Sequence, residues 1–360
     1  KIKSKEELTM IALQEKTNTI PVLNGPVLDA PAIDGLVFRG FHGPEDYPAM
    51  VAIIEGSKEV DQLEHATTVE DIARDYEHLI NSDPYRDMLF VEMHGEVVGY
   101  SRVFWFKRDD GTYAYGHFAN LLPAWRGQGI RRAMLHHNER RLREIAIAHI
   151  NSNGRSAAER YFESWANTTE MHWRALLTEA GYVPVRYGYL MVRPDLENIP
   201  DLPLPDGVEV RPVRPEDYWT IWYAAKEAFR DHWGYSDDEW ADTNFKGWQE
   251  SDIFTPELWQ VAWEGDEVAG MVLNYIDHKE NAAYHRLRGY TETICVRRPW
   301  RRKGVARALI ARSLVIHKAL GMTEASLGVD AQNPNGALQL YESMGFRQVR
   351  ENAAFHKSLA

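Results

Sequence analysis

The chain has 360 residues, a length that favours two domains, and its hydrophobic content of 44% is enough to build globular cores. Its formal net charge of −12 argues against bulk binding to nucleic acid or to anionic membranes, and we see neither an apolar run of membrane-spanning length nor a signal-peptide core after Lys1. The single cysteine, Cys295, excludes an intrachain disulfide and is typical of the reducing cytoplasm, where we expect this protein to reside.

The first elements of the chain occur twice. Residues 1–30 show no clear pattern, and we interpret them as an arm or an extra helix. After them, a short strand at residues 37–39 leads to Pro44, and proline is favoured in the first turn of a helix. The same order, a strand at 208–211 followed by Pro215, returns about 171 residues later and indicates an internal repeat.

The repeat continues through a pair of strands and a glycine-containing turn. Residues 89–99 predict two strands joined by a tight turn, and residues 259–270 show the same pattern. Further along the first repeat, Arg126–Arg131 contains two glycines and precedes an amphipathic helix that we expect from Arg132 to about Ala148.

Proline marks the boundary between the two repeats. Pro200, Pro203 and Pro205 fall within residues 196–207, and this spacing predicts a semi-rigid linker. We therefore expect one domain at residues 31–195 and a second at residues 208–360.

The most informative stretch is a predicted strand, turn and helix in the second repeat. Residues 291–296 are apolar and β-branched and predict a buried strand, and apolar residues recur at helical spacing from Ala308 to Leu320. The basic turn between them, Arg301–Ala306, leaves backbone N–H groups at a positive helix end, which is an anion-binding arrangement. Gly304 is the only glycine in this turn, so it is neither a nucleotide P-loop nor a dinucleotide-binding fingerprint.

This turn resembles Arg/Gln-x-x-Gly-x-Gly/Ala, the pyrophosphate-binding signature of the GNAT superfamily of acyl-CoA-dependent N-acyltransferases. A second block, Val329–Asn335 followed by Leu340–Phe346, is similar to the other half of that signature. The resemblance is strong over residues 208–360. It implies an α/β (α+β) fold of two tandem GNAT domains, each a mixed, splayed β-sheet flanked by helices.

The resemblance also implies acetyl-CoA as a cosubstrate and assigns residues to its binding. These residues are Ile294, Cys295, Val296, Arg301, Arg302, Lys303, Gly304, Val305, Ala306, Asn333 and Asn335. The family asparagine usually lies seven residues before its tyrosine, where this chain has Pro334, so either asparagine is a candidate for the CoA contact.

The two repeats differ where the chemistry is expected. His117 in the first repeat stands where the second has Glu292, each nine residues before the first arginine of its turn. At the last position of the motif, Ala306 is small enough for backbone to approach a pyrophosphate, whereas Arg131 is not. A leucine corresponds to Tyr341. We interpret the first repeat as a degenerate copy, with CoA binding there left open and acetyl transfer not expected.

Acyl transfer to an amine needs a polarised thioester carbonyl, a base for the ammonium and an acid for the leaving thiolate. The resemblance assigns polarisation to the backbone of residues 294–296 and the acid to Tyr341. Glu292 lies on the same strand, where burial would raise its pKa into the range of a useful base or amine-orienting group. The alternatives are local hydrogen bonding for Glu292 and helix packing for Tyr341.

Other residues give weaker signals. The stretch Phe229–Trp240 mixes aromatic and acidic residues, and it either covers an acceptor pocket, as the family resemblance implies, or packs as a cap over the core. We interpret Cys295 as a buried hydrophobic residue, because no His or Asp is placed to activate it as a nucleophile. No paired His/Cys spacing supports a metal site. The weak candidates for substrate binding are Tyr290, His232, Trp233 and His117.

Together these features predict an acetyl-CoA-dependent N-acetyltransferase that acts on a primary amine of a small molecule. The tandem plan is similar to that of the mycothiol synthase family, so a mycothiol-synthase-like or aminoglycoside-type specificity is one alternative. A non-catalytic acyl-CoA-binding sensor or scaffold is another, although the pair Glu292 and Tyr341 favours an enzyme. We expect no nucleic-acid or membrane partner, no metal, and a monomer or homodimer.

Overall fold

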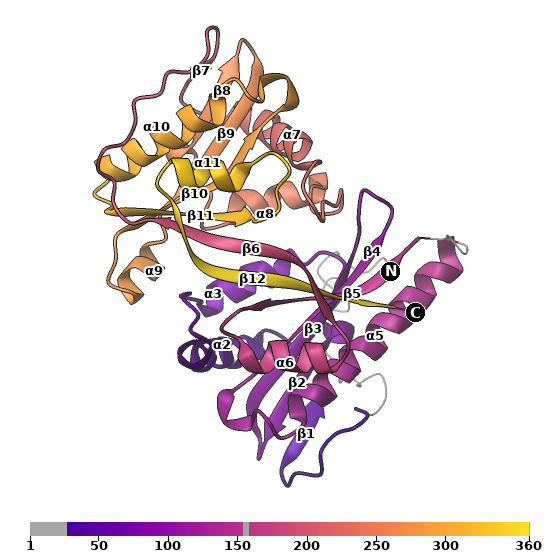
Figure 1. The fold of residues 1–360 in the computed structure, drawn as a ribbon. Coiled ribbons are helices and arrows are strands. Elements are labelled where there is room, and N and C mark those ends of the chain that lie inside the picture. Colours follow the sequence, from indigo (N-terminus) through magenta and orange to yellow (C-terminus); the bar gives the residue numbers. More distant parts are fainter. Residues whose placement is uncertain (1–26, 154–157, 360) are drawn as a thin grey trace, which may run out of the picture. The chain divides into compact units, whose positions relative to one another are not determined.

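The computed structural model describes residues 27–153 and 158–359 (Figure 1). Contacts between residues divide the chain into two compact units, which we describe separately. Unit 1 contains residues 27–60, 67–105 and 115–153, and unit 2 contains residues 61–66, 106–114 and 158–359. Of the arm predicted at residues 1–30, residues 1–26 lie outside the described part of the chain.

Unit 1 contains a sheet with the strand order β1-β2-β3-β4, together with helices. One of these helices, α3, begins with a capping box between its N-cap Thr68 and Asp71. The ends of β3 and β4 belong to unit 2. Its core cluster comprises Phe41, Met50, Ile53, Ile72, Met88, Phe90 and Tyr100. The elements are β1 (Leu36–Arg39), α2 (Tyr47–Asp61), α3 (Val69–Glu77), α4 (Pro84–Asp87), β2 (Met88–Met93), β3 (Glu96–Lys107), β4 (Tyr113–Leu121) and α5 (Ile130–Asn153), with 3-10 turns at Pro44–Asp46 and Pro123–Trp125.

Unit 2 has the strand order β5-β12-β6-β11-β10-β9-β8-β7, in which β10 and β11 are parallel and the other pairs are antiparallel. Its elements are β5 (Arg160–Asn167), α6 (Met171–Glu179), β6 (Val183–Arg193), β7 (Glu209–Val210), α7 (Tyr218–Phe229), α8 (Phe245–Glu250), β8 (Gln260–Glu264), β9 (Glu267–Tyr275), α9 (His278–Ala283), β10 (Arg288–Val296), α10 (Val305–Ala319), β11 (Glu324–Asp330), α11 (Ala337–Ser343) and β12 (Arg347–Ser358), with 3-10 turns at Pro215–Asp217, Asp242–Asn244, Pro256–Leu258 and Arg298–Trp300.

The element boundaries confirm the internal repeat. A 3-10 turn that begins at the predicted proline precedes both α2 and α7. Strands β4 and β10 each have nine residues and are followed by a 3-10 turn, a glycine turn and a long helix. The helix expected from Arg132 to Ala148 is α5, which is longer at both ends than predicted. It begins directly after Gly129, whose φ of 85° is a left-handed conformation that favours glycine.

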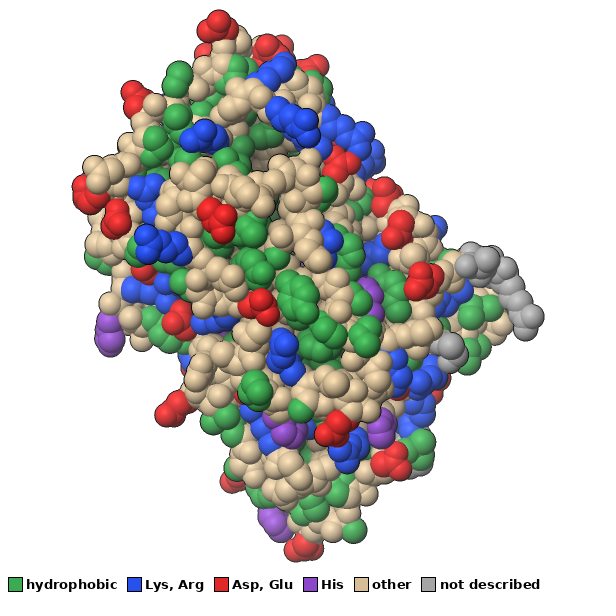
Figure 2. All heavy atoms as spheres, in the orientation of Figure 1, with side chains coloured by type: hydrophobic (Ala, Val, Ile, Leu, Met, Phe, Trp, Pro, Cys, Tyr) green, Lys and Arg blue, Asp and Glu red, His purple; other side chains and the backbone are tan. Residues whose placement is uncertain are grey.

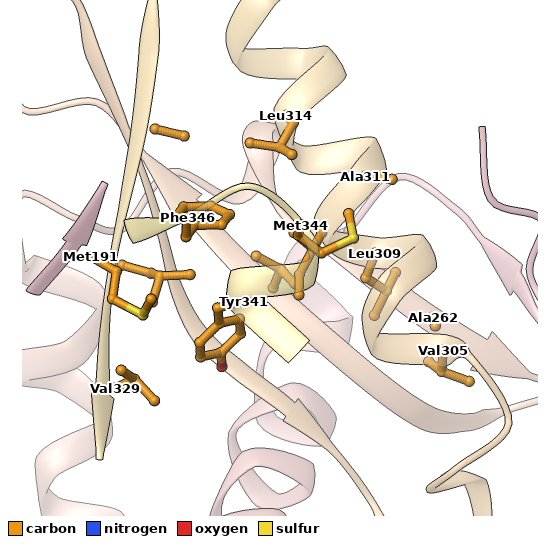
Figure 3. Close-up of a cluster of buried hydrophobic side chains, with 14 of the residues drawn as sticks. Met191, Ala262, Val305, Leu309, Ala311, Leu314, Val329, Tyr341, Met344 and Phe346 are labelled. Carbon is orange, nitrogen blue, oxygen red and sulfur yellow. The ribbon is translucent and has the colours of Figure 1, made fainter. Parts of the chain in front are cut away.

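The sheet of unit 2 is covered on both faces. Neighbouring residues of β9 alternate between two core clusters: Val268 and Met271 pack with α7, whereas Ala269 and Val272 pack with α10 and α11. Adjacent side chains of a strand point to opposite faces, and a register shift of β9 against β8 at Ala269 explains why residues 268 and 271, three apart, share one face. Figure 3 shows part of the second cluster, in which Leu309 and Leu314 of α10 face Met344 and Phe346.

Strands from both repeats interleave within unit 2. The last strand, β12, lies between β5 and β6, pairing Asn352 with Asn167 on one side and with Gly188 on the other. Strand β6 in turn lies between β12 and β11. The sheet therefore contains strands from both sides of the predicted linker at residues 196–207, and the two long strands β6 and β12 run beside one another in Figure 1.

Candidate functional site

The parallel strands β10 and β11 separate after three residue pairs, the last being Tyr290 with Ser326. Beyond this point a side chain bridges the strands, because the backbone N–H of Gly328 donates to Glu292 Oε1 at 3.1 Å. A Cβ at position 328 would lie 3.8 Å from that oxygen, which is ordinary contact. The separation of the strands thus leaves Glu292 at the mouth of the gap between them.

A bulge interrupts β10 at the same point. Its register with β9 shifts between Glu292 and Cys295, so that Thr293 and Ile294 have no partner in either strand pairing. Thr293 has a φ of 48°, an unfavourable conformation for a β-branched residue. Strained backbone and bulges occur frequently at functional sites, where they redirect backbone groups.

A cavity of ≈ 840 Å³ opens at this gap, entirely within unit 2. Its wall includes the bulged end of β10, the glycine turn before α10, the end of β11, the turn before α11 and the end of α7. The sequence-predicted residues that line it are Glu292, Ile294, Cys295, Val296, Arg301, Arg302, Gly304, Val305, Ala306, Asn333, Asn335, Tyr341 and His232.

Four sequence-predicted residues do not line the cavity. Lys303 is exposed on the glycine turn, and His117 is buried on β4 in unit 1. Tyr290 is buried, with its ring stacked on Tyr275 at 4.8 Å and its hydroxyl bonded to Glu280. Trp233 packs near Trp165 and His356.

The glycine turn, residues 301–306, has the geometry of an anion site. Gly304 lines the cavity and has a φ of 90°. A Cβ there would meet no atom within 4 Å, so the backbone at Gly304 borders open space. Helix α10 begins at the next residue, and the first N–H groups of a helix have no partner within it. A glycine turn at a positive helix end fits the diphosphate of an acyl-CoA.

The side chain of Arg301 holds this turn in place. Its Nε donates to Val296 O at 2.9 Å, one terminal nitrogen donates to Ala228 O at 3.2 Å, and the other bonds Asp231 at 2.5 Å. The guanidinium groups of Arg298 and Arg301 hold the pKa of Asp231 well below its usual range. The sequence included Asp231 only within the stretch Phe229–Trp240 and gave no sign of its bond to Arg301, because the two residues lie far apart along the chain.

The electrostatics of the cavity favour acid–base chemistry. Burial raises the pKa of Glu292 to about 7, although the Gly328 N–H opposes this shift. Burial, reinforced by Glu292 and Cys295, raises the pKa of Tyr341, so its hydroxyl stays protonated. In Figure 3 the ring of Tyr341 lies among hydrophobic side chains, with its oxygen directed away from Phe346.

Cys295 is poorly suited to nucleophilic chemistry. Its side chain is buried, and burial raises the pKa of its thiol to about 12, which suppresses the reactive thiolate. On the face of the molecule shown in Figure 2, acidic and basic side chains are interspersed.

The first repeat carries a modified version of the turn. Arg126 Nε donates to Leu121 O at 2.9 Å, as Arg301 does to Val296 O in the second repeat. At the position of Ala306, however, Arg131 is buried and its Nε donates to Ala119 O at 2.7 Å. The arginine side chain therefore lies against the end of β4.

Among the helices of the described residues, none is both long enough and apolar enough to cross a bilayer. In residues 27–153 and 158–359, His, Cys, Asp and Glu side chains form no group that could hold a metal ion.

Two copies of a strand, glycine turn and helix, the second beside a splayed parallel strand pair, define a tandem GNAT protein. The model of the Acetyltransferase (GNAT) family matches residues 53–166 and 219–346, and the chain belongs to this family. The predicted fold of two tandem GNAT domains is confirmed. A comparison with curated protein sequences gives no match.

Solved structures share this fold over most of the chain. A GCN5-related N-acetyltransferase from Sphaerobacter thermophilus has a TM-score of 0.66 and 24% identity, covering 91% of this chain and 96% of that one. A tandem GNAT protein from the clavulanic acid biosynthesis pathway has a TM-score of 0.63 and 14% identity, covering 90% of this chain and 99% of that one. A glucosamine N-acetyltransferase region of a fungal GH3 β-N-acetylglucosaminidase has a TM-score of 0.61 and 13% identity. The match covers 91% of this chain and 38% of that one.

Proposed function

We propose that this protein is an acetyl-CoA-dependent N-acetyltransferase whose working site is the cavity of unit 2, and that its acceptor is a primary amine of a small molecule. The observation that carries the proposal is the position of Glu292. It is a partly buried carboxyl group with a pKa of about 7, and it shares one cavity with the glycine turn and Tyr341. A base poised near neutral pH is what amine acylation requires.

Groups that line the cavity would hold acetyl-CoA at its diphosphate and along its pantetheine arm. The backbone of the glycine turn would bind the diphosphate, and Arg302, which is exposed there, would add positive charge. Asn333 and Asn335 border the same cavity and would contact the pantetheine arm. Asn333 Oδ1 already accepts from the Asn335 N–H at 2.9 Å, so the side-chain amide of Asn335 is the better placed to turn toward a ligand.

The transfer step follows from the groups at the strand gap. The amine nitrogen attacks the thioester carbonyl carbon, and its proton passes to Glu292, directly or through a water. Backbone N–H groups at the bulge, residues 294–296, polarise the carbonyl oxygen. As the carbon–sulfur bond breaks, Tyr341 gives its proton to the sulfur, so that CoA leaves as a thiol. The Tyr341 phenolate is then reprotonated from solvent, and Glu292 releases to solvent the proton that it took from the amine.

A titration and an amine screen test this proposal. We expect calorimetry to give one acetyl-CoA site per chain, and a thiol-detecting assay to show CoA release with at least one of glucosamine, 2-phenylethylamine, putrescine and kanamycin. Glucosamine is included because the fungal structural neighbour is described as a glucosamine N-acetyltransferase region.

Three results would contradict it in different ways. Two acetyl-CoA sites would show that the first repeat still binds CoA despite Arg131. Binding of acetyl-CoA without release of CoA in the presence of any of the four amines would favour a sensor or scaffold. An absence of binding would exclude acetyl-CoA as the ligand.

A further inference from the structure

One wall of the cavity comes from an irregular segment after α7. We call residues 232–240 the cap segment. Its two ends, His232 and Trp240, line the cavity, as does Phe229 of α7. An irregular segment has no ladder of its own to hold it, so other contacts must fix its position.

The cap segment is bound by the turn between β3 and β4, residues 106–114, which belongs to unit 2 although it is distant in sequence. Arg108 donates from one terminal nitrogen to Gly234 O, and Ser236 Oγ donates to Lys107 O at 2.8 Å. The Asp109 N–H donates to Tyr235 O at 3.2 Å. Gly234 has a φ of 76°, a left-handed conformation that directs its carbonyl to Arg108.

Arg108 is itself held rigidly. Its other terminal nitrogen bonds Glu163 Oε1 at 2.9 Å, and both residues are buried. His356 Nε2 lies 2.9 Å from the second oxygen of Glu163, and Glu239 of the cap segment lies 3.6 Å from Arg108. Charge-assisted hydrogen bonds in a buried network are strong and directional, so this network positions the Gly234 carbonyl accurately.

The opposite side of the cap segment is held by a different element. Lys226 of α7 donates to Trp240 O at 3.2 Å and lies 3.4 Å from Asp237. Loss of Arg108 would therefore loosen only the middle of the segment. The glycine turn has contacts of its own, since Arg301 bonds Val296 and Ala228 in addition to Asp231, which directly precedes the cap segment.

We propose that Arg108 and Ser236 are positioning residues for the acceptor, which fix the cap segment and thereby set how tightly the amine binds. This proposal rests on the proposed function, in which the glycine turn binds acetyl-CoA, and it adds that the cap segment borders the part of the cavity that receives the acceptor. It requires that the turn between β3 and β4 affects acceptor binding and leaves acetyl-CoA binding unchanged.

The test compares the parent protein with Arg108→Met, Ser236→Ala and a matched control, Arg211→Met. Arg211 also donates to a glycine carbonyl, that of Gly265, at 3.3 Å and packs on Trp263, but it does not line the cavity. Hydrogen exchange is measured for peptides that cover residues 232–240 and 301–307. Steady-state kinetics are measured with acetyl-CoA and the amine of the four-member panel that the parent acetylates fastest.

We expect faster exchange in the cap segment of both variants and parent-like exchange at residues 301–307. The KM for the amine should rise about tenfold in Arg108→Met and about threefold in Ser236→Ala, with kcat and the KM for acetyl-CoA within about twofold of the parent. Arg211→Met should match the parent in every measurement.

Unchanged exchange in the cap segment would overturn the proposal, and so would faster exchange with an unchanged amine KM. An equal rise in both KM values would show a general structural role. If Arg108→Met fails to fold because Glu163 loses its partner, Ser236→Ala, which removes an uncharged contact, decides the question. If the parent acetylates none of the four amines, the proposed function fails, and the exchange data still decide whether the turn holds the segment.

Discussion

The carboxyl group of Glu292 is subject to two opposing effects. Burial in the gap between β10 and β11 disfavours the charged form, whereas the hydrogen bond from the Gly328 N–H favours it. The first effect is larger, and the pKa rises from 4.5 to about 7. At neutral pH a large fraction of the protein therefore carries the carboxylate that a base requires, and a large fraction carries the acid.

This balance predicts the pH dependence of the reaction. Because the deprotonated form is the base in the proposed mechanism, kcat/KM should fall about tenfold per pH unit below pH 7 and level off above about pH 8, after correction for ionisation of the amine itself. Glu292→Gln should lower kcat by about 10²–10⁴-fold and abolish this dependence. A variant that keeps the same pH profile would show that another group is the base.

Tyr341 gives a second prediction for a single residue. Tyr341→Phe should lower kcat about a hundredfold, because the proposed proton donor to the sulfur is lost, while affinity for acetyl-CoA stays within about twofold. Tyr189→Phe is the matched control, since Tyr189 packs on the same hydrophobic cluster but lies outside the cavity wall. Equal losses in the two variants would mean that the hydroxyl of Tyr341 serves packing alone.

At the scale of elements, helix α10 carries a similar glycine near each end. Gly304 precedes its first residue with a φ of 90°, and Gly321 follows its last turn with a φ of 81°. A Cβ at either position would meet no atom within 4 Å. The two glycines therefore place the same conformational demand on a substituent, but only Gly304 lines the cavity.

This symmetry provides an internal control for the ligand site. Gly304→Glu should weaken acetyl-CoA binding about a hundredfold or more in calorimetry, because a carboxylate would occupy the space expected for the diphosphate and repel it. Gly321→Glu should destabilise the protein to a similar degree and keep parent affinity. A loss of affinity in both variants would point to unfolding of α10 instead of a blocked site.

Local patterns predicted the strand at residues 291–296, the turn at 301–306 and the helix from Ala308 to Leu320, because each signal lies within a few residues of the next. The bulge at Thr293 had no such signal, since its left-handed conformation is imposed by pairing with β9 on one side and separation from β11 on the other. The bonds that Asp231 and Arg108 make could not be predicted from the sequence either. Their partners, Arg301 and Gly234, are distant in sequence, and single charged residues carry no periodicity.

At the scale of the whole molecule, the two repeats have diverged at one motif position with a large consequence. Ala306 leaves space at the start of α10, whereas Arg131 is buried and bonded to Ala119 O at the end of β4. The sequence identified this difference, but not the bond that fixes the arginine. The interleaving of β6 and β12 also left no local trace, because strand partners are chosen by tertiary packing.

The interleaved strands predict how the chain responds to cutting. A protease site introduced after Asp201, which is exposed in the linker, should yield two fragments that co-elute in native size-exclusion chromatography and separate only in denaturant. The reason is that β6 would remain hydrogen-bonded to β11 and β12 of the other fragment. Fragments that separate under native conditions would contradict this sheet topology.

The position of β12 between β5 and β6 also constrains how the protein is made. Asn167 of β5 is synthesised long before its partner Asn352, and at about 5–20 residues per second the interval is roughly 10–40 s. During that time the edges of β5 and β6 that β12 will cover are open to pairing with other chains. A nascent chain on the ribosome therefore holds two unfinished sheet edges, and we expect its yield in cells to depend on chaperones that shield them.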